Sequence, residues 1–145
     1  MREIDDPKVI KDHLKEFAPK ILTTVLIIDG KTLDTILKNN DTEQAFFDIS
    51  IKAPCVCVCR CSPTQKARIC QLLKLYTNGK RIAGVGDGGN DVGMILEADV
   101  GIGIVGKEGM QASLASDFSI LEFGNLRKLI LWHGRLSYKR SAVLS

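Results

Sequence analysis

Short apolar runs alternate with amphipathic stretches along most of the chain. The apolar runs are short, rich in β-branched residues or cysteine, and bounded by turn residues, which is typical of buried strands. They lie at residues 24–28, 53–59, 81–86, 100–105 and 117–120. Between them, apolar residues recur at helical spacing, as at Leu33, Ile36 and Leu37. This alternation predicts an α/β fold with a mainly parallel sheet flanked by helices.

The best-marked helix start is at Ser62, which directly precedes Pro63 and lies three residues before Gln65. This arrangement predicts an N-cap, a proline at the first helical position and a capping box. Lys66 is unexpected here because a cation in the first turn opposes the helix dipole. An anion bound at the helix N-terminus would make it favourable. The alternative is a solvated surface lysine.

Four of the five cysteines alternate along one predicted strand and therefore share one face of it. They lack the paired spacing of zinc sites, and same-face neighbours are poorly placed for disulfides. We therefore predict that the cysteines are small buried core residues. They are Cys55, Cys57, Cys59, Cys61 and Cys70.

Composition is that of an ordinary globular domain of 145 residues, with 45% hydrophobic and 26% charged residues. The net charge of +3 is too small to indicate a nucleic-acid partner. No run approaches the roughly 18 apolar residues of a membrane span, and no signal peptide is recognisable. The chain as written is expected to be soluble.

Candidate chemistry is concentrated in residues 81–95, where an apolar run enters a glycine-rich turn and then a helix. Asp87 and Asp91 lie four residues apart, at the carboxyl end of the predicted strand, where ligands of open α/β sheets bind. Carboxylate oxygens suit Mg2+, and glycines allow close approach of a phosphate and positive φ. The alternative is a plain turn in which Asp91 is a first-turn helix carboxylate.

Residues 86–91, Gly-Asp-Gly-Gly-Asn-Asp, resemble the GDGxND motif of P-type ATPases, a branch of the haloacid-dehalogenase (HAD) superfamily. Residues 92–104 and the Gly-Lys-Glu-Gly-Met-Gln-Ala segment at 106–112 resemble the lipid-translocating subfamily in particular. Cation pumps usually carry a Thr-Gly-Thr-Asp-type segment there. The resemblance implies a HAD-like Rossmannoid fold, present here as a partial domain.

The resemblance also implies site residues for phosphoryl transfer from ATP to an aspartate. Asp87 would hold Mg2+, with Asp91 as a second ligand or a partner of the first. Asn90 and Gly88 would contact phosphoryl oxygens, and Lys66 would neutralise them. Asp29 and Arg60 are candidates for the nucleotide side, with a turn or cap role favoured for Asp29.

The expected organisation has three parts. Residues 1–22 are a linker or insertion with a short helix starting at Asp6-Pro7, and residues 23–124 are the C-terminal part of a phosphorylation domain. Residues 125–145 carry five arginines and lysines and no acidic residue. By resemblance they form a stalk helix leading toward a membrane helix; on composition alone, an ordinary surface helix is an equal alternative.

Together these observations predict a fragment of an ATP-driven phospholipid flippase. The Asp-Lys-Thr-Gly-Thr nucleophile segment of the family is absent, so the isolated chain is expected to be inactive. The full-length protein would be an integral membrane protein with this domain in the cytosol. Its candidate partners are phospholipid, as the transported substrate, and an accessory subunit. The alternatives are a cation-transporting P-type ATPase, a free-standing HAD phosphatase and a non-catalytic module that binds Mg2+ or a partner.

Overall fold

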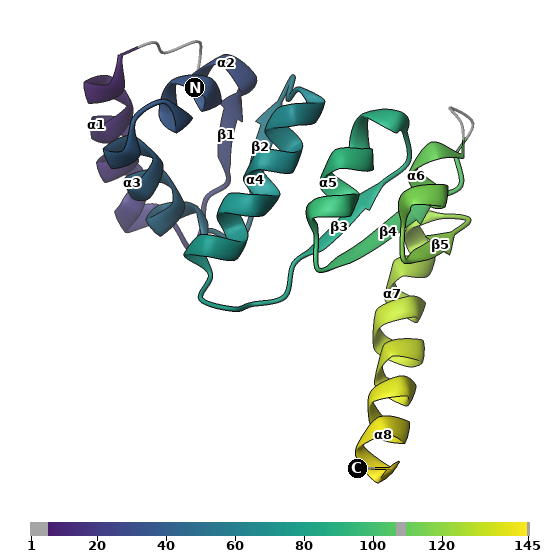
Figure 1. Ribbon diagram of the computed structural model, residues 1–145. Helices are drawn as coiled ribbons and strands as arrows, with labels where there is room; N and C mark the ends of the chain where they lie inside the picture. The colour runs from purple at the N-terminus through teal and green to yellow at the C-terminus, as the bar shows by residue number, and fades with distance from the viewer. Residues whose placement is uncertain (1–5, 107–109, 145) are drawn as a thin grey trace. The chain divides into compact units, whose positions relative to one another are not determined.

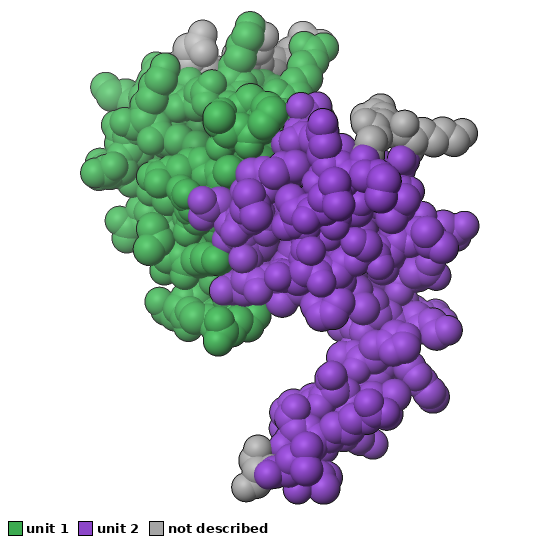
Figure 2. Space-filling view, turned by 45° about the vertical axis from the view of Figure 1, so that its right-hand side comes forward, with its two compact units in different colours: residues 1–81 green, residues 82–145 purple. Residues whose placement is uncertain are grey.

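The computed structural model describes residues 6–106 and 110–144, which form two compact units. Unit 1 comprises Met1–Arg81 and unit 2 comprises Ile82–Ser145 (Figure 2). Each unit has its own parallel sheet and its own helices, and each is described by itself below.

Unit 1 contains a two-stranded parallel sheet with helices before, between and after its strands (Figure 1). The strands β1 and β2 pair in the register Leu26↔Val56 through Asp29↔Cys59. In chain order, the elements are α1 (Pro7–Phe17), a 3-10 turn η1 (Ala18–Lys20), β1 (Leu26–Asp29), α2 (Gly30–Leu37), α3 (Asn40–Ser50), β2 (Val56–Cys59) and α4 (Pro63–Tyr76).

The core of unit 1 lies on one face of this sheet, where β1 meets all four helices. Leu26 and Ile28 alternate inward along β1, as the period of a strand requires. The helices contribute Ile10, Leu14, Leu33, Ile36, Phe46, Phe47 and Leu72. The first two belong to α1, whose predicted cap is present because the Asp6 side chain accepts a hydrogen bond from the Lys8 N–H. Residues 7–17 therefore form the predicted helix and pack against the core of unit 1.

The prediction that the cysteines are core residues is wrong for three of the five. Cys55, Cys57 and Cys59 share one face of β2, as their alternation predicted, but that face is exposed. The inward positions belong to Val56 and Val58, which pack against the core. Of the remaining two, Cys70 on α4 is buried. The alternation determined a shared face, but the side on which the helices pack decided which face is covered.

Unit 2 contains a three-stranded parallel sheet in the order β3-β4-β5. Its elements are β3 (Ala83–Gly86), a 3-10 turn η2 (Gly89–Asp91), α5 (Val92–Glu97), β4 (Val100–Ile104), α6 (Gln111–Ala115) and β5 (Phe118–Ile120). Residues 107–109, which precede α6, lie outside the described part of the chain.

Glycines on β3 and β4 lie opposite each other, with Gly84 paired to Gly101 and Gly86 to Gly103. A Cβ at Gly103 would lie 2.5 Å from the Ser113 Cα of α6, and one at Gly101 would lie 2.7 Å from the Ile95 side chain of α5. The missing side chains therefore let both helices lie directly on the strands, since glycine in a strand allows close packing.

A long helical segment follows β5 (Figure 1). It runs through η3 (Phe123–Asn125), α7 (Leu126–Lys128), a π-helical stretch η4 (Leu129–Gly134) and α8 (Arg135–Leu144). Every residue from 130 to 144 is exposed. Among the residues that the structure describes, no helix has both the length and the apolar content needed to cross a membrane.

The predicted fold class is confirmed: the protein is α/β, with parallel strands flanked by helices. The five strands occur near the predicted positions, and each is one to three residues shorter than predicted. One sheet was expected, and the structure has two. Periodicity reports which segments are strands, but not which strands share hydrogen bonds.

Candidate functional site

The glycine-rich turn after β3 forms the centre of the candidate site in unit 2. Asp87 directly follows the carboxyl end of the strand, as predicted, and it is exposed. Asp91 ends the turn and is only 9% exposed. Its Oδ2 lies 3.4 Å from the Asp87 backbone nitrogen, which donates to it. The two carboxylates therefore have different surroundings. The Asp87 carboxylate faces outward, and the Asp91 carboxylate is turned back onto the turn that carries Asp87.

Gly86 makes this arrangement possible. A Cβ at this position would lie 2.2 Å from the Asp91 Cβ and 2.8 Å from its Oδ2. Glycine allows positive φ, but the glycines of this turn do not adopt it; among the described residues, Gly79 is the glycine with positive φ. Gly88, for example, has φ −128°. The turn needs glycine for space rather than for backbone conformation.

The other turn residues are placed by the same short segment. Asn90 is exposed and Gly88 is buried. Gly89 lies under the first residue of α6, since a Cβ there would be 2.0 Å from the Gln111 Oε1. The start of α6 thus covers one side of the turn, a contact that no sequence signal indicated.

The donor set at this turn fits a hard cation that is shared with phosphate. Mg2+ takes one or two protein carboxylates and completes its shell with water and phosphate oxygens. Asp87 supplies one exposed carboxylate and Asn90 an exposed amide oxygen. No group of three or more His, Cys, Asp or Glu side chains in the described residues is arranged to hold a metal ion alone. The exposed oxygens of the turn therefore suit an ion that completes its shell with water and phosphate oxygens.

Lys66 lies in unit 1, in the first turn of α4, and is half-buried. The predicted capping box is confirmed: the Ser62 hydroxyl accepts from the Gln65 N–H at 3.2 Å, and the Gln65 Oε1 accepts from the Ser62 N–H at 2.8 Å. The Lys66 charge lies near the half-buried Cys61. Burial raises the pKa of the Cys61 thiol, while the lysine acts in the opposite direction.

Asp29 has the cap role that was favoured for it. Its Oδ1 accepts from the Thr32 backbone N–H at 2.8 Å and its Oδ2 from the Thr32 hydroxyl at 3.1 Å, which begins α2. These bonds, led by that from the backbone, lower the Asp29 pKa. Arg60 is exposed and follows β2 with φ +55°, an uncommon conformation for a residue with a side chain.

The structure thus brings the predicted site residues together in two groups. Asp87, Gly88, Asn90 and Asp91 share one turn of unit 2. In unit 1, Asp29 and Arg60 lie at the carboxyl ends of the paired strands β1 and β2, and Lys66 lies in the first turn of the helix that follows β2.

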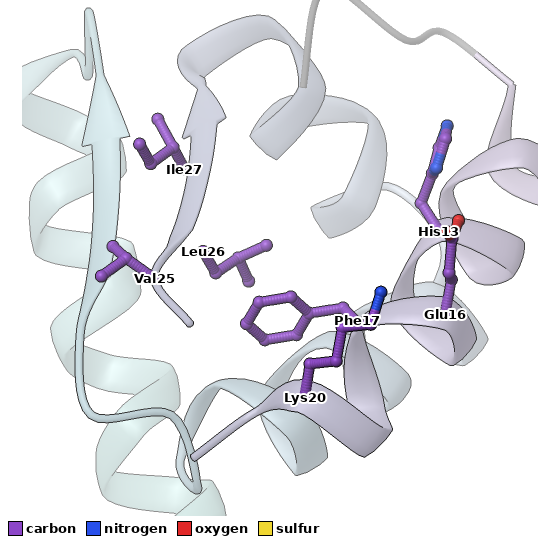
Figure 3. Close-up of a pocket in the computed structure, with 7 residues that line it drawn as sticks. All are labelled: His13, Glu16, Phe17, Lys20, Val25, Leu26 and Ile27. Carbon is purple, nitrogen blue, oxygen red and sulfur yellow. The ribbon is translucent and has the colours of Figure 1, made fainter. Parts of the chain in front are cut away.

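A separate cleft of about 340 Å³ lies in unit 1, between α1, η1 and the start of β1. Figure 3 shows the Phe17 ring pointing toward Leu26. The residues that line the cleft are His13, Glu16, Phe17, Lys20, Val25, Leu26 and Ile27. None of the predicted site residues lines this cleft, so it is not the candidate site.

Comparison with known proteins identifies the class. The family model described as "Phospholipid-translocating P-type ATPase C-terminal" matches residues 113–145. The chain is 58% identical over 120 residues to "Phospholipid-transporting ATPase NEO1" of Saccharomyces cerevisiae, which covers 83% of this chain. It is 56% identical over 119 residues, or 82% of the chain, to the human "Probable phospholipid-transporting ATPase IIB". "Phospholipid-transporting ATPase 6" of Arabidopsis thaliana is 49% identical over 137 residues, or 94% of the chain.

The chain has an α/β fold with parallel strands and an aspartate-glycine turn at a strand end, as the resemblance implied. The identities are far above those of a shared fold alone, and every relative named above is a phospholipid transporter by name. The chain belongs to the phospholipid-transporting P-type ATPases, the lipid flippases. It spans 10% of the length of each of these relatives.

Proposed function

We propose that the chain supplies the Mg2+-binding and phosphate-binding part of a site where a flippase forms and hydrolyses an aspartyl phosphate. The observation that carries the proposal is the turn after β3. There, an exposed Asp87 lies at a strand end and a buried Asp91 accepts from its backbone N–H. Phosphoryl transfer depends mainly on positioning and charge neutralisation. The turn would offer the first directly and the second through a bound Mg2+.

Asp87 would hold Mg2+ and Asn90 would orient a phosphoryl oxygen. Mg2+, when bound, neutralises negative charge on the transferred group. Asp91 keeps the turn closed by its bond to the Asp87 N–H. Gly88 leaves room for a phosphate, because it brings no side chain to the turn.

Lys66 would neutralise a phosphoryl oxygen from the N-terminus of α4, where both the helix end and the ammonium group favour an anion. Asp29 caps α2 and Arg60 forms the turn between β2 and α4, so both residues would have a structural role. The nucleophilic aspartate would come from another part of a longer protein, because no Asp-Lys-Thr-Gly-Thr segment occurs in these residues. The chain alone would then be inactive.

In the longer protein, the cycle of phosphorylation would drive phospholipid across a membrane; the relatives are named phospholipid-transporting ATPases. ATP would be the phosphoryl donor, and this part of the protein would face the cytosol. Residues 125–145 would connect it to a membrane helix, and an accessory subunit is compatible with this arrangement.

The test uses a full-length relative, such as the yeast ATPase, that carries this chain in place of its own aligned segment; we call it the host ATPase. Phosphoenzyme is formed with radiolabelled ATP, quenched in acid and counted. We expect Asp87→Asn and Lys66→Ala each to lower its rate of formation on the order of 100-fold or more, as the loss of one charge-stabilising group does elsewhere. The exposed Asp48 and Lys52 provide matched controls as Asp48→Asn and Lys52→Ala.

A rate within about twofold of the unsubstituted host ATPase in either site variant would refute the role given to that residue. A second test needs only the chain itself. Mg2+ titration followed by NMR should move the signals of Asp87 and Asn90 in the presence of phosphate, and unmoved signals would contradict the metal site.

A further inference from the structure

The Gln65 side chain makes more hydrogen bonds than a helix cap requires. Its Oε1 accepts from the Ser62 N–H, which completes the capping box. Its Nε2 donates to the Gly30 carbonyl oxygen at 2.7 Å and to the Asp34 Oδ1 at 2.6 Å. The residue is only 9% exposed. Both amide hydrogens and the amide oxygen are therefore committed, and they join the start of α4 to two positions on α2.

The backbone around Gln65 is packed closely at the same place. A Cβ at Gly30 would lie 2.6 Å from the Arg60 carbonyl oxygen and 3.1 Å from the Gln65 Oε1. Arg60 itself has φ +55°. Non-glycine residues keep such a conformation where their surroundings determine it, and these positions often belong to functional sites. We call Gly30, Asp34, Arg60 and Gln65 the Gln65 junction.

Lys66 is the next residue after Gln65, and its position follows from the junction. The Lys66 backbone N–H donates to the Ser62 carbonyl oxygen at 3.0 Å, the first helical bond of α4. A lysine is a point charge on a flexible stem, so the backbone from which it extends must be held if the charge is to have a defined place. The capping box alone would hold the start of the helix. The two Nε2 bonds additionally attach that start to α2 and to the turn after β1.

We propose that Gln65 is a positioning residue for Lys66. It holds the first turn of α4 against the β1–α2 turn, so that the Lys66 ammonium group is presented at one place toward a phosphoryl group. Gln65 does not touch the substrate itself. This inference rests on the phosphate-neutralising role proposed for Lys66 above.

The test compares three variants in the host ATPase. Gln65→Met keeps the length of the side chain and removes all three of its hydrogen bonds. Ser62→Ala removes the hydroxyl of the capping box and leaves the two Nε2 bonds in place. Gln71→Met is the matched control, because Gln71 lies on the same helix and its bond to Arg68 is exposed and 3.5 Å long. Melting temperature is measured for each by size-exclusion chromatography after heating.

We expect Gln65→Met to lower the rate of phosphoenzyme formation at saturating ATP by roughly 10-fold to 100-fold, the range associated with a misplacement of about 1 Å. The KM for ATP should change by less than about twofold, and inhibition by orthovanadate, a phosphoryl mimic, should weaken by a factor similar to that of the rate. Ser62→Ala should lower the melting temperature and change the rate by less than about threefold. Gln71→Met should change neither.

Equal rate losses in Gln65→Met and Ser62→Ala would overturn the inference, because Gln65 would then matter only for helix stability. If Gln65→Met does not fold, Asp34→Ala takes its place: it removes one of the two Nε2 bonds and should lower the rate several-fold at unchanged ATP KM. An unchanged rate in that variant would also overturn the inference. Failure of the proposed function is seen separately, as an active Lys66→Ala variant.

Discussion

Gly86→Ala is the substitution that most directly tests the geometry of the turn after β3. The new Cβ would lie 2.2 Å from the Asp91 Cβ, 2.7 Å from its Cγ and 2.8 Å from its Oδ2. Non-bonded carbon atoms normally lie about 3.5–4.0 Å apart. Asp91 must therefore move by about 1 Å or more, and because its Cβ is attached to the backbone, the 3-10 turn must move with it.

The size of the effect follows from this displacement. Overpacking a close-packed site typically costs about 1–3 kcal/mol of stability. The hydrogen bond from the Asp87 N–H to Asp91 is already 3.4 Å long, so its loss adds little to that cost. The larger consequence is for chemistry, because a reacting group displaced by about 1 Å can lower a rate on the order of 100-fold.

Two measurements separate these effects. Native-state hydrogen exchange of the amides in β3 and β4 reports the local stability of unit 2 without assuming that the whole chain unfolds in one step. Phosphoenzyme formation in the host ATPase, measured over a range of Mg2+ concentrations, reports the site. We expect faster exchange, a lower maximal rate and a higher Mg2+ concentration at half-saturation.

Gly124→Ala is the control, because a Cβ at that position would meet no atom within 4 Å. It should change stability by less than about 0.5 kcal/mol, as surface substitutions usually do. If Gly86→Ala left both the exchange of the strand amides and the Mg2+ dependence within about twofold of the unsubstituted protein, Gly86 would not be needed to make room for Asp91.

Three further predictions concern unit 1. Phe47→Ala should lower the free energy of unfolding, measured in urea, by about 3–5 kcal/mol, since the ring is only 1% exposed and packs in the core. Leu75→Ala, at a 70% exposed position, should lower it by less than about 0.5 kcal/mol. Similar losses in the two variants would contradict the core assignment. Iodoacetamide should modify Cys57 in the folded chain and Cys70 only after unfolding, as read by mass spectrometry, because the first thiol is exposed and the second is buried; early modification of the buried thiol would count against the fold. The pKa of Asp29 is lowered below its usual 3.8 by the backbone N–H bond that it accepts, so its contribution to stability is present above that pH and is lost as the pH falls through the lower folded-state value. Asp29→Asn should therefore make acid unfolding less steep below pH 3.8, and an unchanged acid limb would show that this carboxylate does not contribute.

Local sequence rules predicted the parts of the structure that depend on neighbouring residues. The capping box at Ser62, the cap at Asp6 and the position of Asp87 at a strand end are all present as predicted. In each case the partners lie within four residues, so the sequence contains both sides of the interaction. The role of the turn in chemistry stays a prediction.

Contacts between distant segments were not predictable in the same way. The sequence indicated that Gln65 caps a helix, but its bonds to Gly30 and Asp34 join residues 35 and 31 positions away. The alternation of Cys55, Cys57 and Cys59 predicted a shared face and not its exposure. Similarly, the sequence showed the glycines of the turn but not why they are needed. Asp91 crowds against Gly86, which is a contact between a side chain and a strand, and the φ preference of glycine does not report such a contact.

Local patterns in the sequence therefore predicted the α/β class, the positions of the strands, the helix starts at Asp6 and Ser62, and the motif that indicates the family. These follow from periodicity and from caps and turns, which act over a few residues. The pairing of the strands into two sheets, the covered face of β2, and the way Gln65 and Gly86 hold the segments that carry Lys66 and Asp91 became visible in the folded chain. Burial and close packing depend on which distant segments meet in space, and rules that act over a few residues do not report those contacts.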